Sequence, residues 1–297
     1  MDPIPSFKFS DGIQIPILSY GFGTANFMGN DEDIIKKTVM AIKNGFYSLD
    51  CAEAYHNEAA VGAGIKASGV PREKLFVTTK VVGSKNQDIR AALDTSLSKL
   101  GLKYLDLYLV HVPFAAGSPE GQQAIWKQME ELMGSGKVKS IGVSNCMQDD
   151  IEIILQTAKI PPAVNQIEYH PYLQHGDLID FLRRQDIGVV VFSPLTPITT
   201  GRPGPLDETY VELAKKYGVT EGDIALRWCF DQGIPAITTS SNEQRLQGYR
   251  SKAFTFKLAP AEIKQISELG KQKHHQGMTV AYMGSTYGNY KAGTEVD

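Results

Sequence analysis

The sequence predicts an α/β protein built as one (β/α)8 TIM barrel. Eight short β-rich runs recur along the 297 residues, and a longer segment with helical spacing follows each of them. The runs carry Val, Ile and Leu at both odd and even positions, which is typical of parallel strands covered by helices on two faces. Eight such units in roughly 250 residues favour a closed barrel over an open sheet. Because no Ser-, Pro- or Gly-rich linker divides the chain, we expect a single domain over residues 1–297.

The expected strands are short, and the expected helices have polar starts and frequent Gly stops. The strands are residues 18–23, 46–50, 75–80, 104–111, 138–145, 162–168, 188–194 and 234–240, and clear helices are 31–45, 87–101, 120–136, 177–185 and 209–218. Before the barrel, Asp11-Gly12 predicts the turn of an N-terminal β-hairpin that closes the barrel bottom. After it, residues from about 271 to 297 lose periodicity and predict a C-terminal loop, and a resemblance to a known family, carried by the motifs given below, implies that this is a substrate loop.

Composition argues for a small-molecule partner. The 30 Lys and Arg nearly balance the 33 Asp and Glu, leaving a net charge of −3 and no overall field for nucleic acid or an anionic membrane. We expect a monomer or weak dimer. Three scattered cysteines predict free thiols in a reducing compartment. Without a basic-then-apolar start or an apolar run of membrane-spanning length, the expected location is the cytoplasm.

Four polar side chains stand at or just after the ends of neighbouring strands. Asp50 ends the second strand and is followed by Tyr55, while Lys80 ends the third strand and His111 the fourth. The active site of such a barrel lies at the carboxyl ends of its strands. A carboxylate, a phenol, an ammonium and an imidazole are therefore expected to meet at one rim.

This set suits the reduction of a carbonyl group by hydride. The developing alkoxide needs a proton, and Tyr55 can donate it, although a phenol with a pKa of about 10 is a slow donor near neutrality. Lys80, held by Asp50, is expected to lower that pKa by about two to three units, or roughly 3 to 4 kcal/mol. A neutral His111 can donate a hydrogen bond to the substrate oxygen.

Five segments resemble motifs of the aldo-keto reductases, in the same order, between Gly21 and Arg245. They are LDCAEAYHNEAAVGAGIK, LFVTTKV, YLDLYLVHVP, GKVKSIGVSN and NQIEYHPYLQ. The resemblance implies an NADPH-dependent carbonyl reductase on a (β/α)8 barrel. It also implies that Asp50, Tyr55, Lys80 and His111 form the catalytic tetrad, with Tyr55 as the general acid.

The same resemblance implies cofactor positions. Gly23 and Thr24 would let the backbone approach the cofactor, with Asp50 near its reactive end. The nicotinamide carboxamide would be bound by Ser144, Asn145 and Gln166, and its ring would stack on Phe192. The pyrophosphate would be bound by Ser193, Pro194 and Leu195. The 2′-phosphate would be bound by Thr239, Ser240, Ser241, Asn242 and Arg245. The forked guanidinium of Arg245 suits a phosphate. The family often has Lys at Thr239, and Gln or Glu plus Asn at Gly248 and Tyr249, so the preference for NADPH over NADH is expected to be weaker.

Two rival sites are set aside. Gly62, Gly64 and Ala67 match the dinucleotide pattern G-x-G-x-x-A, but they lie in a predicted helix with no strand before them. The histidines and cysteines show no ligand spacing, so no metal is expected.

The substrate pocket departs from the aldose-reducing members of the family. Ala25, Val82 and Val112 stand where those enzymes have tryptophans, and Phe27 is expected to line the same pocket with Tyr55 and His111. The pattern resembles fungal ketoreductases of the conjugated polyketone reductase kind and implies a bulky ketone, an α-dicarbonyl or a keto-lactone as substrate. Imine reduction on the same scaffold and a non-catalytic NADPH-binding subunit stay open as alternatives.

Overall fold

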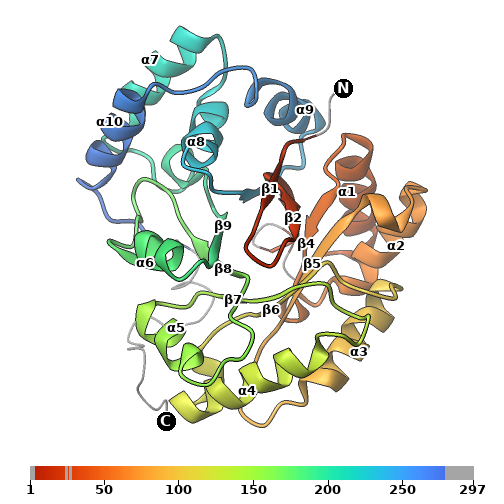
Figure 1. Cartoon of the computed structure of the whole chain (residues 1–297). Helices are drawn as coiled ribbons and strands as arrows, with labels where there is room; N and C mark the ends of the chain where they lie inside the picture. Colours follow the sequence, from red (N-terminus) through yellow and green to blue (C-terminus); the bar gives the residue numbers. More distant parts are fainter. Residues whose placement is uncertain (1–3, 24–25, 27–28, 278–297) are drawn as a thin grey trace.

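Eight parallel strands close into a barrel in the computed structural model, which describes residues 4–23, 26 and 29–277 (Figure 1). Neighbours around the barrel follow the chain, and the last strand pairs with the first. The strands are β3 (Leu18–Gly21), β4 (Ser48–Asp50), β5 (Phe76–Val81), β6 (Leu107–Val110), β7 (Ile141–Ser144), β8 (Val164–Glu168), β9 (Gly188–Phe192) and β10 (Ala236–Thr238). Each lies within an expected run, except that β5 extends one residue further, to Val81, and the predicted fold is confirmed.

The N-terminal hairpin pairs β1 (Ser6–Lys8) with β2 (Gln14–Pro16) and covers the centre of the ring (Figure 1). Its turn forms at Asp11, whose carboxylate accepts the Ile13 amide at 2.9 Å, and at Gly12, whose φ of 89° favours glycine. Phe9 packs so closely on Gly188, at the start of β9, that a Cβ there would lie 2.1 Å from its ring. The hairpin therefore closes the amino-terminal end of the barrel, as expected.

Helices surround the strands, and all five expected helices form. Their ends lie within two residues of the predicted ends, except that the helix predicted over 120–136 ends four residues earlier, at Leu132. Side-chain caps fix several starts: Asn30, Asp88 and Ser118 accept backbone amides of the first turns of α1, α3 and α4. The helices are α1 (Asp31–Lys43), α2 (Glu58–Ser68), α3 (Ile89–Leu100), α4 (Pro119–Leu132), α5 (Gln148–Leu155), α6 (Leu178–Arg184), α7 (Asp207–Tyr217), α8 (Glu221–Phe230), α9 (Glu243–Lys252) and α10 (Pro260–Gly270).

The G-x-G-x-x-A pattern serves helix packing. Gly62 and Gly64 lie inside α2, and a Cβ at Gly62 would lie 2.3 Å from the Leu100 carbonyl oxygen of α3. At Gly64 it would lie 2.4 Å from Cβ of Thr38 in α1. The two glycines thus let α2 approach both neighbouring helices, which accounts for the pattern without a nucleotide.

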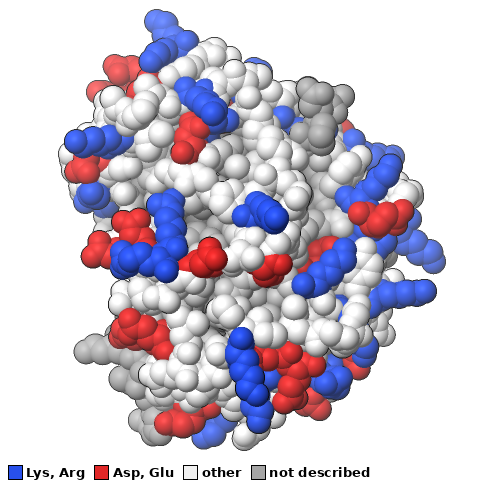
Figure 2. Space-filling view, viewed as in Figure 1, with Lys and Arg blue, Asp and Glu red and all other residues white. Residues whose placement is uncertain are grey.

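Basic and acidic side chains are interspersed over the face that carries the hairpin (Figure 2). Within the described residues, no helix combines the length and apolar character needed to cross a membrane. Trp126 on α4 and Trp228 on α8 are almost fully buried, as expected for packing residues.

Candidate active site

The four predicted catalytic residues come together at the carboxyl end of the barrel. Asp50 is the last residue of β4, Lys80 lies near the end of β5, and His111 follows β6. Tyr55 ends a short 3-10 turn, η2 (Glu53–Tyr55), between β4 and α2. Parallel pairing of β4, β5 and β6 brings these positions to one rim, since adjacent strands end on the same side.

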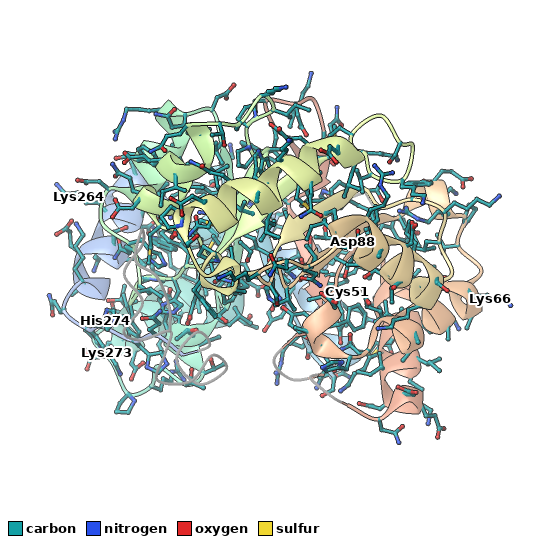
Figure 3. The ribbon with its side chains drawn as sticks, turned by 90° about the horizontal axis from the view of Figure 1, so that it is seen from below. Cys51, Lys66, Asp88, Lys264, Lys273 and His274 are labelled. Carbon is teal, nitrogen blue, oxygen red and sulfur yellow. The ribbon has the colours of Figure 1, made fainter. Side chains whose placement is uncertain are left out.

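Lys80 is held by a buried ion pair. Its Nζ lies 2.5 Å from Asp50 Oδ1 and donates to the Cys51 carbonyl oxygen at 2.9 Å. Lys80 is fully buried and Asp50 is 5% exposed, so neither charge is well solvated. Burial lowers the pKa of Lys80, but the charges of Asp50 and Tyr55 outweigh it and the net pKa is raised. The ammonium therefore stays charged. Cys51, whose carbonyl oxygen accepts from Lys80, is fully buried and is labelled in Figure 3.

The rings of Tyr55 and His111 meet edge to face, with centroids 5.5 Å apart and planes at 81°. Lys80 Nζ lies 5.2 Å from the centre of the Tyr55 ring. Burial, reinforced by the charge of Lys80, lowers the pKa of His111 to about 3. His111 is therefore neutral at physiological pH, as the sequence analysis expected.

The prediction that Lys80 lowers the pKa of Tyr55 below its ordinary value is wrong. Burial raises the pKa above 10, and the nearby Lys80 charge only partly offsets this rise because Asp50 acts in the opposite direction. Sequence reasoning counted the cation and left out the cost of burying a phenolate. Tyr55 is accordingly a fully protonated phenol near neutrality.

Three predicted cofactor residues are hydrogen-bonded to this group. Gln166 Nε2 donates to Asp50 Oδ2 at 2.8 Å, and Ser144 Oγ donates to the Gln166 carbonyl oxygen at 2.7 Å. Asn145 has a φ of 60°, and its Nδ2 donates to the His111 carbonyl oxygen at 3.0 Å. The ends of β7 and β8 thus join the strands that carry Asp50 and His111.

The predicted pyrophosphate loop begins at the end of β9. Phe192 is the last residue of that strand and is partly exposed. Ser193 has a φ of 58°, and Thr196 donates its hydroxyl to the Ser193 carbonyl oxygen at 2.9 Å, which makes a tight turn. Pro194 and Leu195 complete this turn before the 3-10 helix η5 (Thr196–Ile198).

The predicted phosphate segment forms the start of α9. Asn242 caps the helix by accepting the Arg245 amide at 3.0 Å, while the Ser240 hydroxyl accepts the Asn242 amide at 3.0 Å. Ser241 and Arg245 are exposed, and Thr239 is partly buried. An exposed guanidinium beside a helix amino terminus fits a phosphate group. Tyr249, which departs from the family pattern, is buried against Gly222 of α8.

Of the predicted pocket residues, Val82 is partly exposed after β5 and Val112 is 5% exposed after His111. Thr24, Ala25 and Phe27 lie outside the described residues. Gly23 is described, and a Cβ there would lie 3.1 Å from Tyr55 Cζ. Its small size thus leaves room for Tyr55, and the approach of a cofactor to its backbone stays a prediction.

Sequence reasoning missed Glu53 and Glu58, which flank Tyr55. Their hydrogen bonds reach β5 and the residues just after it. The only available signal was that both lie within the motif around Tyr55, which does not show where their carboxylates point. Among the described residues, no group of three or more His, Cys, Asp or Glu could hold a metal ion.

Comparison with known proteins agrees with this arrangement. The family model "Aldo/keto reductase family" matches residues 20–271. A Schizosaccharomyces pombe NAD/NADP-dependent indole-3-acetaldehyde reductase is 40% identical over 89% of this chain and 94% of its own. A Saccharomyces cerevisiae NADPH-dependent alpha-keto amide reductase is 35% identical over 96% of both chains.

A solved structure supports the same assignment. The Bombyx mori aldo-keto reductase in complex with NADP superposes with a TM-score of 0.82 at 33% identity, over 91% of this chain and 94% of that one. The family model covers Asp50, Tyr55, Lys80 and His111 within residues 20–271. From its barrel, its rim of converging residues and these similarities, we conclude that the chain belongs to the aldo/keto reductase family.

Proposed function

We propose that this protein reduces a ketone or aldehyde to an alcohol with NADPH, and that Tyr55 donates the proton. The observation that carries the proposal is the hydrogen-bonded chain from Lys80 through Asp50 to Gln166, beside the paired rings of Tyr55 and His111. It joins a proton donor, a fixed cation and a neutral imidazole to strand ends that can hold a nicotinamide. Relatives that are reductases by name support the same chemistry.

When bound, NADPH supplies the hydride to the carbonyl carbon. Tyr55 gives its phenolic proton to the carbonyl oxygen as negative charge develops there. The phenolate that results is stabilised by Lys80, whose ammonium Asp50 keeps in place. Neutral His111 donates a hydrogen bond to the same oxygen and orients the carbonyl. Lys80 thus acts mainly on the charge that forms during the reaction, since the resting pKa of Tyr55 is not lowered.

The residues at the end of β10 fit an NADPH-type cofactor. Arg245 is exposed in the first turn of α9 and Ser241 is exposed just before it, where backbone amides and a guanidinium can meet a 2′-phosphate. The related fission yeast enzyme is described as using NAD or NADP. We therefore propose a preference for NADPH that is weaker than in members with a Lys in place of Thr239.

The proposed substrate is a bulky ketone or an α-dicarbonyl compound. Val82 and Val112 leave the pocket wall short and aliphatic, and a second electron-withdrawing carbonyl makes the reacting carbon a better hydride acceptor. The related budding yeast enzyme is named for an α-keto amide, which has such a pair of carbonyls. Preferential turnover of open-chain sugars would contradict this substrate class.

We also propose one domain in which the tail from about residue 271 lies near the substrate. The described start of this tail supports the idea. The His275 amide donates to the Tyr172 carbonyl oxygen at 3.1 Å, and the Gly277 amide donates to Glu168 Oε1 at 3.0 Å. Glu168 ends β8, so the chain reaches the carboxyl end of the barrel at residue 277. Lys273 and His274, which precede Gly277 in the chain, are labelled at the edge of the molecule in Figure 3.

The experiment is a steady-state assay of NADPH oxidation with an α-keto ester, a simple bulky ketone, an open-chain aldose and a cyclic imine. The proposal expects the two ketones to be reduced with the highest kcat/KM. A higher value for the imine would favour imine reduction. Tight NADPH binding by calorimetry without turnover of any substrate would favour a non-catalytic subunit.

A further inference from the structure

Tyr55 lies on a short turn, whereas its partners lie in or next to barrel strands. The 3-10 turn η2 is three residues long and is followed by His56, whose φ of 55° breaks the helical path before α2. Lys80 is fixed by β5 and by two hydrogen bonds. The distance between the phenol and the ammonium therefore depends on what ties this turn to β5.

Hydrogen bonds of Glu53, the first residue of η2, connect this turn to the residues after β5. Its Oε2 accepts the Val82 amide at 2.9 Å, and both carboxylate oxygens accept Gln87 Nε2 at 3.2 Å. Gln87 Oε1 in turn accepts the amides of Gly83 and Ser84 at 2.9 and 3.0 Å. One carboxylate thus connects the Tyr55 turn to the whole loop that carries Val82.

Glu58 ties the back of the turn to the strand itself. It is 2% exposed in the first turn of α2, and its Oε1 accepts the Thr79 hydroxyl at 2.7 Å. Its Oε2 accepts the Ser96 hydroxyl of α3 at 3.3 Å. Burial raises the pKa of this carboxyl, and the two hydroxyl donors partly offset the rise.

These contacts flank both reacting groups. Glu53 and Glu58 lie on either side of Tyr55 in sequence, and their partners Val82 and Thr79 lie on either side of Lys80. We propose that Glu53 and Glu58 are positioning residues that clamp the Tyr55 turn to β5 and so set the geometry for proton transfer. This inference rests on the proposed function, because it assigns these two carboxyls a part in that reaction.

The effect on rate follows from the sensitivity of proton transfer to position. A displacement of about 1 Å can cost roughly a hundredfold in rate. Releasing Glu53 frees the turn at one end but leaves Asp50, Lys80 and the cofactor residues in place. The expected loss is therefore in kcat, and the binding of NADPH should hardly change.

The test compares Glu53→Ala with Glu130→Ala. Glu130 is a matched control because it is also partly exposed and accepts two backbone amides, those of Lys159 and Ile160 at 2.6 and 2.7 Å, in a loop that contains no predicted site residue. Glu53→Gln keeps an acceptor for the Val82 amide and serves as the rescue variant. Thr79→Val removes the hydroxyl that Glu58 accepts.

For each variant we would measure kcat, KM, the Kd of NADPH, the solvent deuterium isotope effect on kcat and the unfolding midpoint, and solve the crystal structure of Glu53→Ala. Glu53→Ala should lower kcat by about tenfold to a hundredfold, raise the isotope effect and shift the Tyr55 hydroxyl away from Lys80. Glu53→Gln should restore most of kcat, and Thr79→Val should lower kcat by a smaller factor. Glu130→Ala should lose stability without losing kcat.

An unchanged kcat and an unmoved Tyr55 in Glu53→Ala would overturn the clamp while leaving the proposed function intact. Equal losses of kcat in Glu53→Ala and Glu130→Ala would also overturn it, because the effect would then be one of stability. Failure of the proposed function is separate, since the wild-type protein would then oxidise no NADPH with any carbonyl. A Tyr55 that stays in place in the crystal structure refutes the clamp even in that case.

Discussion

Replacing Lys80 with Met tests whether the buried ion pair organises the site. The substitution keeps the length of the side chain but removes the ammonium that lies 2.5 Å from Asp50 Oδ1. Asp50, 5% exposed, would then keep Gln166 Nε2 at 2.8 Å as its remaining partner shown by the structure. Leaving one charge of a buried pair uncompensated typically costs about 3 to 5 kcal/mol, so we expect a loss of about that size in the free energy of unfolding.

The assay is urea unfolding of wild type, Lys80→Met, Asp50→Asn and the double variant. In the double variant neither charge is left without its partner. Its loss in unfolding free energy should therefore be smaller than the sum of the two single losses by about 2 to 3 kcal/mol. We also expect kcat for carbonyl reduction to fall at least about a hundredfold in Lys80→Met, because the phenolate of Tyr55 loses its cation. Additive losses, or a cost below about 1 kcal/mol for Lys80→Met, would refute the argument that this pair is buried and coupled.

His111, Gly23 and Arg245 each allow a further test. Because the pKa of His111 is lowered to about 3, protonation of this residue should not lower kcat/KM between about pH 7 and pH 5. A decrease in kcat/KM centred near pH 6.5 would contradict a neutral His111. The unfolded chain binds a proton on His111 below about pH 6.5, whereas the folded chain does not until about 3. The unfolding free energy should therefore decrease by about 1.4 kcal/mol per pH unit as the pH falls through this window, and urea unfolding of His111→Gln should show a shallower decrease. Gly23→Ala should lower kcat with little change in unfolding midpoint, because the new Cβ would lie 3.1 Å from the Tyr55 ring; an unchanged kcat would contradict that contact. Arg245→Ala should raise the Kd of NADPH at least about tenfold and leave that of NADH nearly unchanged, as measured by fluorescence titration; equal effects on both would remove Arg245 from the phosphate site.

The barrel could be predicted from sequence because its signals are local. Strands such as Leu107–Val110 have apolar residues at both odd and even positions and are buried at every position, and the Asp11-Gly12 turn fixes the hairpin. The convergence of Asp50, Lys80 and His111 followed from strand order alone, since parallel strands end at one rim.

The remaining features depend on distances that no local pattern encodes. The pKa of Tyr55 is set by the balance between burial and two opposite charges, and only the structure shows that burial outweighs Lys80. The links from Glu53 to Val82 and from Glu58 to Thr79 join positions 29 and 21 residues apart. The close approach of Gly23 to the Tyr55 ring is likewise visible only in the structure.

The most direct test of the account is the Tyr55→Phe variant, which keeps the aromatic ring and removes only the phenolic hydroxyl. The measurement is the rate of NADPH oxidation with a ketone substrate, together with the Kd of NADPH. The account predicts that kcat falls by about a hundredfold to ten-thousandfold while the Kd stays nearly the same. Carbonyl reduction at close to the wild-type rate would contradict the central claim that Tyr55 is the proton donor.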